Sequence, residues 1–330
     1  MKHIAMLTIV VGIIFLIMHF TKKNVDEKYK HISYQEILGG VAETDAEKLF
    51  NNDIKISIDS SGSIYILDKK ACIIKKYDCN GKYMFTFGRK GQGPGEFVIP
   101  KSLSIDEYGY IYVADLVKRT IEIYDGNGKY YSYIKIKPAY QDISVMALSR
   151  DSIYVSTSIG DTLIYLYNSK GVVINSFCGA VKEKTRLGQA MSNLISMTID
   201  SGKNIWVSFN GQPIIRKYSR EGYLLAEHQI TTKRVALEKE KEKNNPEAKK
   251  TEFYHYGFDI IYAKKNIYQS SLGQILVINP FSGNVDEILL PSSNDAEKQF
   301  FFANLVYNPK TKEFLFSHKY QSAVKKIIGF

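Results

Sequence analysis

Residues 88–115 read Gly88-Arg-Lys-Gly-Gln-Gly-Pro-Gly-Glu-Phe-Val-Ile-Pro-Lys-Ser-Leu-Ser-Ile-Asp-Glu-Tyr-Gly-Tyr-Ile-Tyr-Val-Ala-Asp115. The stretch opens with a glycine-rich loop and continues with two short runs of β-branched, aromatic and alternating apolar residues, a pattern typical of strands. Between these runs, Asp106-x-x-Gly109 predicts a tight turn, because glycine adopts the positive φ that such turns require. The stretch therefore predicts a loop followed by a β-hairpin.

This hairpin recurs along the chain. Residues 59–65 form a close copy, and weaker copies occupy residues 149–154, 200–206, 264–268 and 308–314. A second series of turns follows each of the first five hairpins about 15 residues later and ends at Gly81, Gly128, Gly171, Gly222 and Gly283. Each unit of about 40–50 residues thus holds four short antiparallel strands, which is the pattern of a β-propeller blade.

The number of units predicts an all-β, six-bladed β-propeller with four-stranded antiparallel blades. We place the blades near residues 52–88, 100–137, 141–178, 193–230, 253–290 and 300–330. The last blade lacks room for a fourth strand. We expect residues 31–38, which have strand character, to supply it and so close the ring without an open edge.

The N-terminus carries an unbroken run of 17 mostly apolar residues, 4–20, flanked by lysines. A secretory apolar region usually spans about 7–15 residues, whereas a membrane span needs about 17–25. No small-residue cleavage pattern follows the run. We therefore expect an N-terminal hydrophobic helix that acts as an uncleaved signal anchor, with residues 1–30 forming anchor and linker and residues 31–330 the propeller. A cleaved signal peptide is the second interpretation.

Membrane orientation follows less directly from the sequence. Lys22 and Lys23 after the apolar run favour, by the positive-inside tendency, a cytoplasmic C-terminal part. A short basic lead before an apolar run is instead typical of export signals. We expect the propeller outside the cytoplasm, in the periplasm or at the cell surface, with a secreted form as the alternative.

Composition sets only broad limits. Apolar residues make up 45% of the chain and charged residues 24%, which is ordinary for a globular protein, and the net charge of +10 favours acidic partners in general. The cysteines Cys72, Cys79 and Cys178 are odd in number and lack metal-ligand spacing. We expect isolated thiols, with a Cys72–Cys79 bridge as the alternative.

Four motifs between residues 91 and 129 carry a family resemblance: Gly91-Gln-Gly-Pro-Gly-Glu-Phe97, the hairpin 106–115 ending in Ile-Tyr-Val-Ala-Asp115, Ile121-Glu-Ile-Tyr-Asp125, and Asn127-Gly-Lys129. Together they resemble the NHL-repeat propellers, most of all a six-bladed group in bacterial cell-envelope proteins. The resemblance is specific over residues 54–137. The family's Asn and Arg after the second strand are replaced here by Lys118 and Thr120.

Propellers usually bind ligands on the face built by the blade-to-blade loops and the loops after the second strands. On that face the sequence places a basic and polar set comprising Lys69, Lys70, Arg89, Lys90, Gln92, Lys118, Arg119, Lys182, Lys184 and Arg186. These residues favour an anionic ligand held by charge-assisted hydrogen bonds, although loops of any basic protein expose Lys and Arg. The glycine-rich loop 88–95 leads into a strand and not a helix, so we interpret it as a connector and not a phosphate cradle.

The resemblance also implies an alternative site, because some NHL-type propellers resemble amidating lyases that hold a metal with channel histidines. His255 and His318 could approach each other there, but loop or core histidines are our expectation. We expect no cofactor, no metal and no catalytic residues.

We therefore predict a non-enzymatic binding or scaffolding module at the cell envelope that recognises a protein, peptide or glycan through one propeller face. The alternative is an NHL-type lyase or hydrolase with a site in the central channel, which convergence of Arg89, Arg119, His255 and His318 would favour. Nucleic acid is not an expected partner, because binding it would require a cytoplasmic location.

Overall fold

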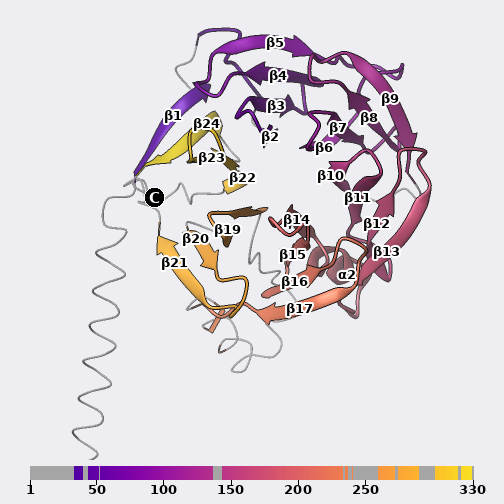
Figure 1. The fold of residues 1–330 in the computed structure, drawn as a ribbon, viewed down its shortest axis with the longest axis vertical. Coiled ribbons are helices and arrows are strands. Elements are labelled where there is room, and N and C mark those ends of the chain that lie inside the picture. The colour runs from indigo at the N-terminus through magenta and orange to yellow at the C-terminus, as the bar shows by residue number, and fades with distance from the viewer. Residues whose placement is uncertain are drawn as a thin grey trace, which may run out of the picture.

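The computed structural model describes residues 33–39, 44–51, 53–136, 143–232, 235–236, 240, 259–271, 274–289, 302–318 and 321–328. Six four-stranded antiparallel sheets stand around a common axis like the blades of a propeller (Figure 1). Within each sheet the strands follow one another outward from the axis in chain order, apart from the outermost strand of the last sheet. The predicted all-β, six-bladed architecture is confirmed.

The strands are short, and the first three blades are built as follows: β2 (Ile54–Ile58), β3 (Ile64–Asp68), β4 (Ile73–Tyr77) and β5 (Tyr83–Phe87); β6 (Pro100–Ile105), β7 (Ile111–Asp115), β8 (Thr120–Tyr124) and β9 (Tyr130–Lys135); β10 (Ile143–Ser149), β11 (Ser152–Thr157), β12 (Thr162–Tyr167) and β13 (Val173–Gly179). The other three contain β14 (Ile195–Ile199), β15 (Ile205–Phe209), β16 (Ile214–Tyr218) and β17 (Leu224–Gln229); β18 (Asp259–Ala263), β19 (Asn266–Ser271), β20 (Gln274–Ile278) and β21 (Val285–Leu289); β22 (Phe302–Asn308), β23 (Glu313–His318), β24 (Gln321–Ile328) and β1 (Ser33–Gly39). A helical turn, α2 (Arg186–Ser192), interrupts the connection between blades three and four.

The aspartate of the repeated Asp-x-x-Gly turn joins that turn to the strand that follows. In blade two, Asp106 Oδ1 accepts the backbone N–H groups of Tyr108 and Tyr110, both at 2.9 Å. Its second oxygen accepts the hydroxyl of Tyr112 at 2.9 Å. Burial, the Asp106 charge and this hydrogen bond raise the pKa of Tyr112 far above its usual value. The aromatic residue six positions after the aspartate therefore ties the following strand to the turn.

The same arrangement occurs in two other blades. Asp59 accepts the hydroxyl of Tyr65 at 3.2 Å, and Asp200 accepts the indole N–H of Trp206 at 3.0 Å. The recurrent sequence pattern thus reflects one local hydrogen-bond pattern, which explains why it could be recognised without tertiary information.

The ring is closed by strands from both ends of the described chain. β1 pairs antiparallel with β24, from Ser33 opposite Ile328 to Gly39 opposite Ala323. Leu38 of β1 is 1% exposed and lies in the core shared by the first and last blades. The segment expected to complete the sixth blade, 31–38, corresponds to this strand.

The predicted N-terminal hydrophobic helix, residues 4–20, lies outside the described residues, and the division into residues 1–30 and 31–330 stays a prediction. Over the described ranges, no helix is long and apolar enough to cross a membrane.

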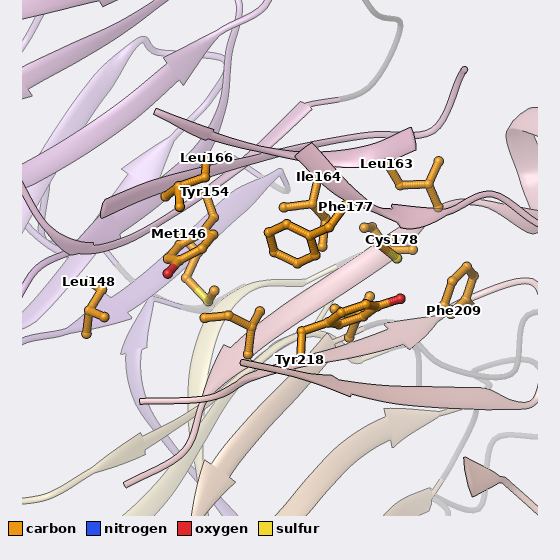
Figure 2. Packing of buried hydrophobic residues seen from close by; sticks show 13 residues of the cluster. Met146, Leu148, Tyr154, Leu163, Ile164, Leu166, Phe177, Cys178, Phe209 and Tyr218 are labelled. Atoms are coloured by element: carbon orange, nitrogen blue, oxygen red, sulfur yellow. The ribbon is translucent and has the colours of Figure 1, made fainter. Parts of the chain in front are cut away.

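Apolar cores fill the spaces between neighbouring blades. Figure 2 shows the core between blades three and four, where Met146, Tyr154 and Phe177 pack with Tyr218. Cys178 is buried in this core, and all three cysteines are free. The expected isolated thiols are therefore present, and the alternative Cys72–Cys79 bridge is not formed.

The antiparallel blades give the ring two faces. One face, here called the loop face, carries the blade-to-blade loops and the loops between the second and third strands, such as residues 88–99 and 116–119. The opposite face, here called the hairpin face, carries the turns between the first and second and between the third and fourth strands, such as residues 106–110 and 125–129.

Candidate functional site

The innermost strands of the six blades surround a central cavity of about 390 Å³. Its lining combines apolar side chains such as Met146 and Met197 with the hydroxyl-bearing residues Ser102, Ser144, Ser196 and Thr198. The volume lies within the range of about 300–1,000 Å³ that is common for small-molecule sites. The channel is therefore large enough for a small ligand, and its polar groups decide what it can do.

Several of these polar side chains hydrogen-bond to the neighbouring blade. Ser104 Oγ accepts the N–H of Ala147 at 3.0 Å, and Thr198 Oγ1 accepts the N–H of Tyr262 at 3.0 Å. Each inner strand has one edge without a strand partner, and its backbone groups need other partners. A side chain of one blade therefore satisfies the inner edge of the next.

An ion pair extends this arrangement. Asp259 Oδ2 accepts the N–H of Leu305 at 3.2 Å and pairs with Lys55 Nζ at 3.0 Å. Lys55 belongs to blade one and Asp259 to blade five. The ion pair therefore bridges two blades that are not neighbours, across the inner strand of the sixth blade. The side chains are 25% and 10% exposed. Because both residues lie at the start of their strands, the pair sits near the loop-face mouth of the channel.

The glycine-rich loop is held by two of the charged residues that the sequence predicts to bind a ligand, Arg89 and Lys118. Lys118 Nζ pairs with Glu122 at 2.7 Å, and Glu122 is almost fully buried. The same ammonium donates to the carbonyl oxygens of Gly93 at 2.9 Å and Glu96 at 2.8 Å. Arg89 pairs with the Glu96 carboxylate at 2.6 Å. In the structure, Lys118 fastens the loop to blade two, and Arg89 closes the loop on itself through Glu96.

This network also affects the titration of Glu96. A hydrogen bond from the backbone N–H of Gly93 and the contact with Arg89 hold the pKa of Glu96 below its usual value. The carboxylate is therefore ionised at neutral pH and compensates the Arg89 charge.

The other predicted residues of the basic set remain at the surface. Lys90, Gln92 and Arg119 are exposed on the loop face, and neither Lys90 nor Arg119 forms an ion pair with another described residue. Lys70, Lys182, Lys184 and Arg186 are exposed on the same face. Lys69 differs, because it pairs with Asp53 at 2.8 Å.

Exposed apolar side chains accompany these cations. Ile99 is 43%, Val117 52% and Leu187 64% exposed; the first two lie in loops of the loop face, and Leu187 lies in α2 on the same face. Cationic and apolar groups on one face form a surface that can contact an acidic partner with both kinds of interaction.

The predicted histidines are not brought together by any described contact. His255 lies outside the described residues, and His318 ends β23, where its backbone pairs with Phe302 and Gln321 but its side chain is not described. Within the described part of the chain, no group of three or more His, Cys, Asp and Glu residues could hold a metal ion.

Sequence reasoning missed the channel residues Lys55, Asp259 and Thr198. A usable signal existed near the start of three inner strands, where Ser102, Ser144 and Ser196 recur. In isolation each serine looks like an ordinary strand residue, so only the repeat alignment would have indicated a polar ring.

The comparisons with known proteins agree on the fold. A family model described as a 6-bladed beta-propeller matches residues 24–169. No curated protein matches the chain in sequence.

Solved structures match over nearly the whole chain at low identity. A streptogramin B lyase is 12% identical, with 91% of this chain and 98% of the lyase covered and a TM-score of 0.57. A catalytically inactive virginiamycin B lyase from Staphylococcus aureus, solved with quinupristin, is also 12% identical, with 90% and 99% covered and a TM-score of 0.57. A predicted exported protein from Bacteroides fragilis is 12% identical, with 91% and 95% covered and a TM-score of 0.57. At such identities the likeness is one of fold, and it supports a six-bladed propeller.

Proposed function

We propose that this protein is a non-enzymatic binding or scaffolding module of the cell envelope. Its ligand is an acidic segment of a protein, peptide or glycan, bound on the loop face. The proposal keeps the NHL-type cell-envelope propellers as the group that the chain resembles. An extracytoplasmic location is also part of the proposal, and the exported-protein description of the Bacteroides fragilis relative agrees with it.

The observation that carries the proposal is the difference between the two groups of charged residues on the loop face. Arg89 pairs with Glu96 of the loop and Lys118 with Glu122 of β8, whereas Lys90 and Arg119 are exposed and form no ion pair within the described residues. An exposed cation beside apolar surface is available to a partner without first breaking an internal pair. Lys90 and Arg119 are therefore the residues we assign to anion recognition.

The channel supports binding more than chemistry. The carboxylate of Asp259 and the hydroxyls of Ser104 and Thr198 are occupied by backbone N–H groups of neighbouring blades. A general acid or base must be free to exchange a proton with a substrate. The remaining support for the lyase or hydrolase alternative is the likeness to streptogramin B lyase, which is a likeness of fold.

The test uses a charge-reversed variant, Lys90→Glu/Arg119→Glu, in the full chain. Retention on immobilised poly-glutamate and on a heparin oligosaccharide is measured against salt concentration. Loss of two charge-assisted contacts should weaken binding by about tenfold or more. The matched control is Lys82→Glu/Lys129→Glu, which changes the net charge equally but lies on the hairpin face. Equal losses in both variants would show that binding follows net charge and not the loop face.

A further inference from the structure

Three consecutive blades carry exposed apolar residues at their hairpin-face tips. Residues 172–174 (Val-Val-Ile) are 39–54% exposed, and residues 223–225 (Tyr-Leu-Leu) are 53–73% exposed at the corresponding place of the next blade. Phe281, at the tip of the following blade, is 87% exposed. Single exposed apolar residues are common in soluble proteins, but a set gathered at one rim marks an interaction surface.

The three tips are joined by packing between blades. The turn at Gly222 packs against Phe177 of β13, and the turn at Gly283 packs against His228 of β17. Each hairpin therefore rests on the outer strand of the preceding blade. The apolar tips thus belong to three neighbouring blades whose outer hairpins contact one another in turn, and we call this set the apolar rim (172–174, 223–225 and Phe281).

The turns around this rim are basic. Across blades three to six they hold eight lysine and arginine residues against three acidic residues, counted over 149–152, 168–172, 200–204, 219–223, 264–265, 279–284 and 308–312. Lys170, Arg220, Lys310 and Lys312 are exposed. A surface of this charge disfavours contact with a second copy of itself and attracts an anionic surface.

The chain enters the ring on the same face. β1 is the outermost strand of the sixth blade and begins at Ser33, opposite Ile328. Outer strands begin at the hairpin face, as β13 and β17 do, so Ser33 lies on that face. Twelve residues, 21–32, separate Ser33 from the apolar run 4–20, and twelve residues can span at most about 40 Å.

From these observations we infer that the apolar rim docks on the surface of an anionic lipid bilayer. The Val, Ile, Leu, Tyr and Phe side chains enter the interfacial region, and the surrounding cations meet lipid headgroups, as in other proteins that lie on membranes. The loop face then points away from the bilayer. The inference rests on residues 4–20 being a membrane anchor and is independent of any ligand on the loop face.

The experiment measures which face touches lipid. The full chain, carrying Cys79→Ser so that the remaining native cysteines are buried, is placed in nanodiscs of zwitterionic and anionic phospholipid. A fluorescent label is attached either at Ser282→Cys beside the apolar rim or at Leu187→Cys on the loop face. Spin-labelled lipids should quench the label at position 282 at least about threefold more than the label at position 187, since interfacial side chains lie at headgroup depth.

Charge reversal supplies the second test. Lys310→Glu/Lys312→Glu should reduce quenching at position 282 about threefold, because each cation near an anionic surface contributes to attraction. The matched pair Lys184→Glu/Arg186→Glu on the loop face should leave it unchanged. Three results would each overturn the inference. The first is equal quenching at both label positions, and the second is failure of the chain to remain with the nanodisc. The third is energy transfer between two copies labelled at position 282 in place of quenching by lipid.

Discussion

Asp115 offers the sharpest test of how the glycine-rich loop is held. Its side chain is fully buried. Oδ2 accepts the backbone N–H groups of Val98 at 2.7 Å and Ile99 at 3.1 Å. Oδ1 accepts those of Val117 and Lys118, each at 3.0 Å. One carboxylate therefore fastens the end of the blade-to-blade loop and the start of the next loop at the same point.

The substitution Asp115→Asn keeps the shape and removes one acceptor oxygen. The asparagine N–H₂ group would face two backbone N–H donors that then lack a partner. A buried donor left unsatisfied costs about 1–3 kcal/mol, so the free energy of unfolding should fall by about 2–6 kcal/mol. Typical single domains are stable by about 5–15 kcal/mol, which makes this loss easy to measure.

The matched control is Asp125→Asn in the exposed turn of the same blade. Asp125 uses one oxygen, Oδ1, to accept the N–H groups of Asn127 and Lys129. Asn168 and Asn279 perform the same task in other blades with an amide oxygen. An asparagine at position 125 should therefore leave stability nearly unchanged.

Urea unfolding followed by the fluorescence of Trp206, the single tryptophan, measures both variants. With an m-value of about 3 kcal/mol/M, the Asp115→Asn midpoint should fall by about 0.7–2 M. Trp206 lies two blades away, so the shift also reports whether the ring unfolds as one unit. Equal midpoints for the two variants would refute the reasoning.

Three further predictions follow from the same hydrogen-bond and packing arguments. Deletion of residues 31–40 exposes the edge of β24 and removes Leu38 from the core, so the melting transition should be lost as a whole; unchanged melting would contradict the role of the closing strand. Glu122→Gln leaves the Lys118 ammonium buried without its carboxylate, which should destabilise the chain by about 3–5 kcal/mol. The 88–99 loop should then become accessible to limited proteolysis, and unaltered cleavage would argue against the network. Burial raises the pKa of Tyr154 to about 12, above the usual value of about 10. The folded state thus favours the neutral phenol, and its stability should be complete below pH 10 and fall as the pH rises towards 12. A Tyr154→Phe variant should show a smaller fall between these pH values, and an unaltered slope would exclude Tyr154 as its source.

The polar lining of the channel illustrates why composition alone misleads about a site. Serine, threonine and aspartate in a cavity invite a catalytic interpretation. In this ring Ser104, Thr198 and Asp259 satisfy backbone N–H groups of the adjacent blade. A propeller has six inner edges facing its axis, and each is buried enough that unpaired backbone groups would cost free energy. Side chains that serve this purpose are needed whatever the protein binds.

The sequence by itself determined the number of blades, their limits and the position of the turns. These features depend on residues close together in the chain: Asp106 caps a turn only two residues away and binds an aromatic residue only six residues away. Strand alternation and glycine turns are similarly local, so they leave a periodic trace that can be read without knowing the fold.

The tertiary structure alone decided which charges are free and what lines the channel. Lys55 and Asp259 are 204 residues apart, and they meet because ring closure brings blades five, six and one together around the axis. The place of Lys118 in a loop predicts a ligand-binding residue, yet its ammonium turns back to Glu122 and the glycine-rich loop. Lys90 and Arg119 stay exposed on the loop face. Sequence periodicity specifies the backbone ring, whereas the direction of each long side chain depends on the partners that the completed ring places within its reach.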